Sequence, residues 1–241
     1  MSILLEVCVD SPAGVAAAIE GGASRIELCS ALDVGGLTPS PGLIALAARA
    51  PIPVYAMIRP RAGSFVFDAQ DEAAMFADIE TVVAAGLAGV VIGASHADGT
   101  LDMALLTRLK MAAGRAGVTL HRAFDLVPDM EIALEQAVEL GVERILTSGG
   151  ARLAVDGARM LARLHLQAGG RIGIMPGSGL RPDNIETILG CGVGEVHASC
   201  RRAVELAPDD RTVAFGFQPA TAHVTDAGIV RQMRARLDDW R

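Results

Sequence analysis

The stretch GVTLHRAFDLVPDMEIALEQAVELGVERILTSG, residues 117–149, holds one complete copy of the unit that decides the fold. A short apolar run at 118–121 predicts a buried strand, residues 130–140 predict a helix, and a second strand follows at 143–147. Gly141 stands where the helix would end, a position that suits the left-handed backbone of a helix C-cap. Strands joined through a helix pair in parallel, so the stretch predicts a strand–helix–strand unit.

The same unit recurs along the whole chain. Strands are predicted at residues 3–9, 24–28, 53–58, 88–92, 118–121, 143–147, 171–175 and 194–197. Helices are predicted at residues 12–20, 43–50, 71–85, 102–116, 130–140, 153–168, 182–189 and 225–240. Strict alternation implies a parallel sheet covered by helices, and eight units predict a closed (β/α)8 TIM barrel that forms a single domain over residues 1–241. An open doubly wound sheet is the alternative, although it usually has fewer strands. Residues 201–224, before the last helix, match none of these elements.

Composition excludes several classes of protein. Hydrophobic residues make up 51% of the chain and charged residues 20%, which excludes a disordered protein. The net charge of −7 and the aromatic fraction of 3% disfavour binding to nucleic acid. A membrane span is not expected, because the longest apolar stretch, residues 82–94, is shorter than the ~20 residues that a span needs. Lys110 is the only lysine and falls within a predicted helix, which argues against a lysine Schiff base.

The N-terminus and the cysteines indicate the compartment. The first ten residues, MSILLEVCVD, lack the features of a signal peptide. The four cysteines form no CxxC pair, so we expect free thiols in a reducing cytoplasm.

Polar side chains stand at the ends of several predicted strands. In a (β/α)8 barrel, alternate strand residues point inward and active sites form at the carboxyl ends of the strands. Carboxylates and imidazoles there could transfer protons, and these catalytic candidates are Glu6, Glu27, His121, His197 and Asp125. Arginines and flexible loops could bind an anionic substrate, and these candidates are Arg59, Arg61, Arg122, Thr147, Ser148, Gly149, Gly177 and Gly179. The alternatives are plain tight turns at the glycines and an internal ion network in which Glu6, Glu27 and Arg59 neutralise one another.

Two cysteines near the same strand ends indicate a metal site. Cys8 and Cys29 each follow a glutamate by two residues on neighbouring predicted strands, so their thiols could approach each other. Thiolates are suitable ligands for Cu(I). The carboxylates and imidazoles at the same mouth would instead suit a divalent ion such as zinc, manganese or iron.

Six motifs follow one another in a specific order: LLEVCVDS at 4–11, RIELCSALDVGGLTPSPG at 25–42, IRPRAGSF at 58–65, HRAFD at 121–125, RILTSG at 144–149 and EVHASC at 195–200. Together they resemble the CutC family, which is named for copper homeostasis. The resemblance implies a cytoplasmic (β/α)8 barrel that forms a homodimer or a larger homo-oligomer and binds Cu(I).

The family's motif residues correspond here to Glu6, Glu27, Arg59, Arg61, His121, Arg122, Asp125 and His197. Cys8 and Cys29 match positions that are cysteine in some relatives. The chain departs from the family pattern at Ala62, Ser64, His96 and Leu120.

Two functions therefore remain open. The first is a Cu(I)-binding protein of copper homeostasis that uses Cys8 and Cys29, with copper as its partner and no organic cofactor. The second is an enzyme that acts on a small anionic metabolite, for example a phosphorylated one. In that enzyme the glutamates and histidines would be the acid and base, and the arginines would hold the anion.

Overall fold

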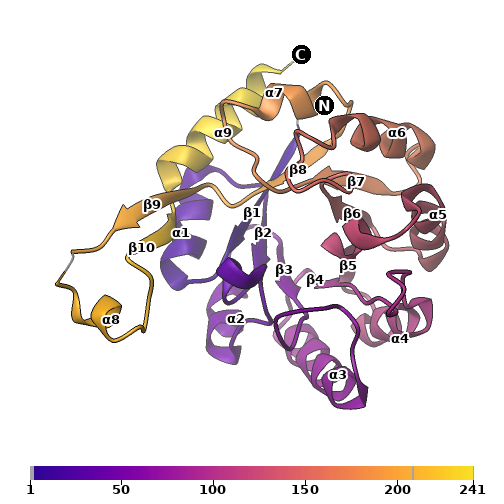
Figure 1. Ribbon diagram of the computed structural model, residues 1–241, viewed down its shortest axis with the longest axis horizontal. Coiled ribbons are helices and arrows are strands. Elements are labelled where there is room, and N and C mark those ends of the chain that lie inside the picture. Colours follow the sequence, from indigo (N-terminus) through magenta and orange to yellow (C-terminus); the bar gives the residue numbers. More distant parts are fainter. Residues whose placement is uncertain (1–2, 208, 241) are drawn as a thin grey trace.

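Eight parallel strands form the centre of the computed structural model, which describes residues 3–207 and 209–240 (Figure 1). They are β1 (Leu4–Val9), β2 (Arg25–Leu28), β3 (Val54–Met57), β4 (Gly89–Ile92), β5 (Gly117–Leu120), β6 (Arg144–Thr147), β7 (Gly173–Pro176) and β8 (Glu195–Ala198). Their order in the sheet is β7-β6-β5-β4-β3-β2-β1-β8, so each strand lies beside its neighbour in sequence and β8 pairs with β1. The predicted (β/α)8 barrel is confirmed.

The ring closes between β7 and β8 by packing, without a regular hydrogen-bond ladder between the described residues of these two strands. Glycines at the start of β7 and just after it make room for side chains of β8. A Cβ at Gly173 would lie 2.4 Å from Glu195 Oε1, and a Cβ at Gly177 would lie 3.2 Å from His197 Cβ. Two large polar side chains therefore occupy this seam, and glycine is what lets them approach β7.

Helices cover the outside of the barrel (Figure 1). They are α1 (Pro12–Gly21), α2 (Pro41–Ala47), α3 (Ala69–Ala84), α4 (Met103–Ala113), α5 (Met130–Leu140), α6 (Ala158–Ala168), α7 (Ile185–Leu189) and α9 (Ala227–Asp239), with short 3-10 turns at Leu32–Val34 and Arg122–Leu126. Helix α1 begins after Ser11, whose hydroxyl accepts a hydrogen bond from the Gly14 N–H. Helix α5 ends at Gly141, which has a φ of 72°, as the sequence predicts.

Helices α6 and α7 begin later than the predicted helices, because local contacts hold the preceding loops. The Asn184 side chain accepts a hydrogen bond from the Arg181 N–H and donates one to the Gly179 carbonyl, which fixes a turn before α7. The loop before α6 packs on the end of β6, where a Cβ at Gly157 would lie 1.9 Å from the Ser148 carbonyl oxygen.

From the sequence we assigned no element to residues 201–224 and placed Thr225 at the start of the last helix. The structure instead describes a hairpin beside the barrel, over residues 201–207 and 209–225 (Figure 1). Its antiparallel strands are β9 (Arg201–Glu205) and β10 (Thr221–Thr225), and the short helix α8 (Arg211–Ala214) lies between them. Arg201 forms ion pairs with Asp10 at 3.0 Å and with Asp33 at 3.1 Å. These pairs tie the base of the hairpin to the mouth of the barrel.

Buried residues fall into two chemical groups. Aliphatic side chains such as Leu5, Ile26 and Val90 are fully buried and belong to one large apolar core. The second group is polar or charged, and consists of Glu6, Arg25, Glu27, Arg59, Ser95, Thr119, His121, Thr147, Ser148 and His197. Charged groups are costly to bury unless they are paired, so this second group requires an explanation. No helix within residues 3–207 and 209–240 is long and apolar enough to cross a membrane.

Candidate functional site

A cavity of about 760 Å³ opens at the carboxyl ends of the strands. The barrel contributes Cys8, Glu27, Met57, Arg59, Phe65, His121, Leu146 and His197 to its lining. The loop after β7, the base of the hairpin and α9 contribute Ser178, Gly179, Arg181, Arg201, His223 and Gln232. A cavity of this size with a few convergent polar groups is typical of a small-molecule site.

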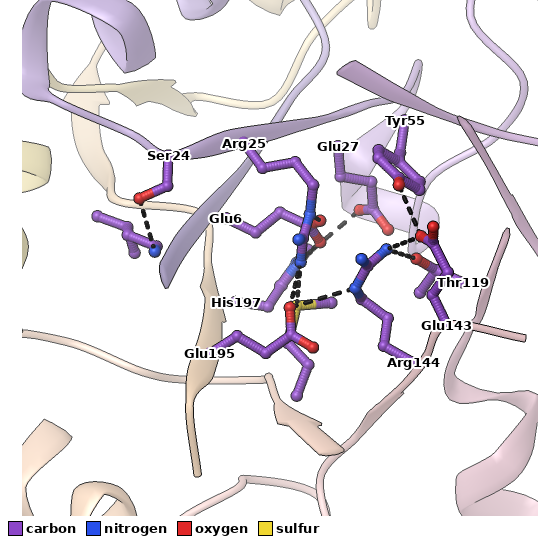
Figure 2. A network of polar contacts seen from close by, with 12 residues as sticks. Glu6, Ser24, Arg25, Glu27, Tyr55, Thr119, Glu143, Arg144, Glu195 and His197 are labelled. Carbon is purple, nitrogen blue, oxygen red and sulfur yellow. Dashed lines mark hydrogen bonds and ion pairs between the residues drawn. The ribbon is translucent and has the colours of Figure 1, made fainter. Parts of the chain in front are cut away.

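An ion-pair network fills the barrel beneath the cavity (Figure 2). Arg25, at the start of β2, bonds to Glu6 through Nε and to Glu195 Oε2 through Nη2 at 2.7 Å. Arg144, at the start of β6, donates to the same Glu195 oxygen at 3.2 Å and to Thr119 Oγ1 at 3.0 Å. Glu6 is therefore paired with Arg25 and not with Arg59, which the ion-network alternative had supposed.

His197 lies between two buried glutamates, Glu6 and Glu27. Strand register explains its position, because Glu6 on β1 lies directly opposite His197 on β8. His197 Nδ1 is 2.9 Å from Glu6 Oε1, and Nε2 is 3.8 Å from Glu27 Oε2. The sequence selected all three residues, and the structure brings them together as one carboxylate–imidazole–carboxylate group.

The charges of this group shift the three pKa values in different directions. Burial alone would raise the pKa of Glu6, but the hydrogen bond with His197 and the charge of Arg25 outweigh it and lower the pKa to about 2. Burial raises the pKa of Glu27, and the neighbouring Glu6 charge adds to this rise. Burial alone would lower the pKa of His197, but its interactions with the Cys8, Glu27 and Glu6 side chains raise it well above its ordinary value. Glu6 is thus a fixed anion that holds a positively charged imidazole.

Cys8, Glu27 and His197 form a cluster with the spacing of a metal site. One donor atom from each residue lies within 4.8 Å of the other two, and all three residues are buried. Cys8 on β1 pairs in register with Glu27 on β2, which explains why the thiol and the carboxylate meet. Cys29 stands outside this cluster. Its thiol donates to Glu27 Oε2 at 3.5 Å, it packs with Tyr55, Met57 and Val91, and burial raises its pKa well above the ordinary value.

Arg59 is a buried cation held by backbone carbonyl groups. Its Nη1 donates to the carbonyls of Val34 and Gly36 at 2.9 and 3.1 Å, and its Nη2 donates to Gly63 at 2.9 Å. The Arg59 Nε–H is buried without a hydrogen-bond partner. Phe65 packs on the guanidinium, with its ring centroid 4.9 Å from Cζ.

His121 is a buried neutral imidazole that, like Arg59, packs against Phe65. The two ring centroids are 4.7 Å apart. Nδ1 accepts a hydrogen bond from the Ala123 N–H at 3.1 Å, so the proton of the neutral ring lies on Nε2. Burial and the charge of Arg59 lower the pKa of His121 to about 3. Nε2 is buried and has no partner.

Asp125 is occupied within its own loop. Its oxygens accept hydrogen bonds from Thr147 Oγ1 at 2.5 Å, from the Ser148 N–H at 2.9 Å, from the Gly150 N–H at 3.1 Å and from Arg122 Nε at 2.7 Å. Among the predicted members of this loop, only Arg122 lines the cavity. The geometry therefore indicates a structural role for Asp125, Thr147, Ser148 and Gly149 in shaping the end of β6.

Of the remaining predicted anion ligands, only Gly179 lines the cavity. Arg61 is partly exposed and pairs with Asp71 at 2.8 Å, and it does not line the cavity. The Gly177 N–H donates to the Thr147 carbonyl at 3.0 Å. Gly179 does line the cavity, in the loop after β7. Lys110 lies in α4, as predicted, where its Nζ donates to the Leu140 carbonyl at 2.6 Å.

Sequence reasoning missed several residues of this region, including Arg25, Phe65 and His223. Arg25 has the same two-residue phase as Glu27, and that signal could have identified it. Phe65 lies in the IRPRAGSF motif, but no spacing rule predicts that it would contact both Arg59 and His121. His223 reaches the cavity from β10, whose strand was not predicted.

Comparisons with known proteins agree with one another. The model of the CutC family matches residues 3–202. The chain is 58% identical over 237 residues to a family protein CutC of Sinorhizobium medicae, covering 98% of this chain and 96% of that protein. It is 32% identical, with a TM-score of 0.78, to a crystal structure from Streptococcus agalactiae provisionally described as copper homeostasis protein CutC, covering 82% and 98% of the two chains. A phosphoribosyl anthranilate isomerase of Thermococcus kodakaraensis, 17% identical with a TM-score of 0.61 and covering 99% and 100%, shares the fold alone.

Proposed function

The chain belongs to the CutC family, and we propose on that basis that it binds one Cu(I) ion at the mouth of the barrel through Cys8 and His197. The observation that supports this proposal is the cluster of Cys8, Glu27 and His197, whose donor atoms lie within 4.8 Å of one another. In this proposal copper is the cargo of the protein and not a catalytic cofactor.

The donor set fits Cu(I). A thiolate is a soft ligand that favours Cu(I), and an imidazole nitrogen binds copper well. Glu6 holds His197 through Nδ1 at 2.9 Å, which leaves Nε2 on the side of Glu27 and Cys8. In many metal sites a carboxylate holds the far nitrogen of a ligating imidazole in this way and so fixes the orientation of the ring. Glu27 Oε1 is buried without a partner, so this oxygen is free to coordinate the ion or to accept the proton that the ion displaces from His197.

Cys29 takes a supporting role in this proposal. The sequence hypothesis paired Cys8 with Cys29, but the Cys29 thiol donates to Glu27 and does not line the cavity. We therefore assign Cys29 to the orientation of Glu27 and assign the direct bond to Cys8.

Anaerobic titration of the metal-free protein with Cu(I), in competition with a chelator, tests the proposal. We expect one Cu(I) per chain, and an X-ray absorption spectrum that contains both sulfur and imidazole ligands. A copper spectrum without an imidazole contribution, or a stoichiometry well below one, would contradict the assignment.

Copper affinity is expected to weaken as the pH falls. The pKa of His197 is raised in the metal-free protein, so at neutral pH the imidazole carries a proton that a metal must displace. Release of one proton makes the dissociation constant rise by about tenfold for each pH unit below the raised pKa. The measurement is the chelator competition repeated at several pH values between about 6 and 8. An affinity that stays constant over this range would show that His197 does not lose a proton to the ion.

The proposal includes a cytoplasmic location and a homo-oligomeric assembly. Four free cysteines suit a reducing compartment, and both features accord with family membership. Light scattering after size-exclusion chromatography tests the assembly, because a mass equal to one chain would contradict it.

A further inference from the structure

A second feature of the cavity lies outside the copper cluster, where Arg59 carries a buried positive charge without an anionic partner. The residue is 5% exposed, and no acidic side chain among the described residues forms an ion pair with it. A guanidinium has five N–H donors, and the three carbonyl bonds leave two of them free, including the buried Nε–H. Burial of a charge whose hydrogen bonds are only partly formed costs free energy, and a bound anion would offset that cost.

His121, whose ring packs against the same Phe65, presents a second free donor in this cavity. Its Nδ1 is already bonded to the Ala123 N–H, so the neutral ring offers Nε2–H as a donor, and this atom has no partner. Phe65 contacts both Arg59 and His121, and all three residues line the same cavity. A buried donor without a partner costs free energy that a ligand oxygen would recover.

We propose that the cavity binds a small organic monocarboxylate, whose oxygens accept hydrogen bonds from Arg59 Nε–H and His121 Nε2–H. The single unpaired charge of Arg59 matches a monoanion. A phosphate dianion would need further unpaired cations, and the other arginines of the cavity already pair with acidic side chains: Arg122 with Asp125, Arg181 with Asp183, and Arg201 with Asp10 and Asp33. Since neither Arg59 nor His121 belongs to the cluster of Cys8, Glu27 and His197, this inference goes beyond the proposed copper site and is independent of it.

The variant His121→Asn separates the proposed donor from the structural role of the ring. The Asn carboxamide oxygen can replace Nδ1 as the acceptor for the Ala123 N–H, but no group replaces Nε2–H. Arg231→Gln is the control for effects of a substitution that are unrelated to the cavity. Arg231 lies on the surface, and in the described chain it pairs only with the exposed Glu20. A melting curve for each variant checks that it is folded.

Calorimetry on the metal-free protein uses acetate, glycolate, lactate and pyruvate as probes, with inorganic phosphate for comparison. We expect at least one monocarboxylate to bind more tightly than phosphate. We expect His121→Asn to weaken its binding by about tenfold or more, the effect of losing a hydrogen bond to a charged group, and Arg231→Gln to leave it unchanged. If none of the four acids binds, if phosphate binds more tightly, or if His121→Asn binds as the original protein does, the proposal is wrong.

Nitrogen-15 NMR of the histidines gives a direct readout that does not depend on a variant. We expect the Nε2–H tautomer of His121 at neutral pH and a shift of that nitrogen when the bound acid is added. A saturating acid that leaves the His121 signals unmoved would overturn the proposal. Cu(I) titration of His121→Asn tests the copper proposal separately from the carboxylate proposal. His121 is not a proposed copper ligand, so this variant should bind copper as the original protein does, whatever the result with the acids.

Discussion

Replacement of Glu6 by glutamine is expected to lower the free energy of unfolding by about 3–5 kcal/mol at pH 7. Glu6 is fully buried, and it bonds to Arg25 on one side and to His197 on the other. The amide has the same size but no charge, so the replacement leaves the Arg25 and His197 cations short of an anion inside the barrel. Removal of one partner from a buried ion pair is costly for this reason, even where the pair itself adds little stability. Urea denaturation measures the change.

Glu20→Gln is the matched control for this prediction. Glu20 carries the same charge and pairs with Arg231 at 3.0 Å, but its side chain is 69% exposed. An exposed pair contributes about 1 kcal/mol or less, so this variant should unfold almost as the original protein does. Equal effects of the two replacements would show that the Glu6 network does not stabilise the fold.

Acid unfolding provides a second check on Glu6. Its pKa is lowered from 4.5 to about 2 in the folded protein, so its charge contributes stability above pH 4.5 that is lost as the pH falls toward 2. Glu6→Gln should remove this part of the pH dependence. The stability curve of the variant should therefore be flatter than that of the original protein between these two pH values.

The barrel was predictable because its elements carry clear local signals. The strand β5 and the helix α5 show apolar runs and a glycine cap that tertiary contacts do not override. The hairpin gave no such signal, because β9 and β10 are exposed or half-buried along their whole length and so lack a one-sided hydrophobic alternation. The exposure of both faces of these strands thus explains why residues 201–224 were left without an assignment.

Some members of the candidate site were predictable, but their pairings were not. The period of two along β1 and β2 correctly grouped Glu6 with Cys8 and Glu27 with Cys29. Which residue meets which across strands depends on register, and the register places Glu6 opposite both Arg25 and His197. Asp125 was selected as a catalytic candidate because it is acidic. In the structure the surrounding loops supply hydrogen-bond donors to both of its carboxylate oxygens, which residue type alone does not reveal.

Replacement of Cys8 by serine is expected to weaken Cu(I) binding by more than about 100-fold. Mutation of a residue that only orients a metal ligand typically weakens affinity by about 10–100-fold. Cys8 would bind the ion directly, and it is the one cysteine of the cluster with Glu27 and His197. The hydroxyl keeps nearly the same size, so the packing around β1 should be maintained. Anaerobic competition with a chelator measures the affinity.

Two other cysteines distinguish the direct ligand from its neighbours. Cys29→Ser should weaken binding by about tenfold, because the Cys29 thiol acts through its 3.5 Å hydrogen bond to Glu27. Cys191→Ser should leave the affinity unchanged, because this thiol contacts the Ala158 carbonyl at 3.3 Å and does not line the cavity. Loss of copper in Cys29→Ser equal to that in Cys8→Ser would favour the thiol pair predicted from the sequence. A double variant Cys8→Ala, Cys29→Ala with unchanged copper stoichiometry would exclude both assignments, since neither of these thiols would then hold the ion.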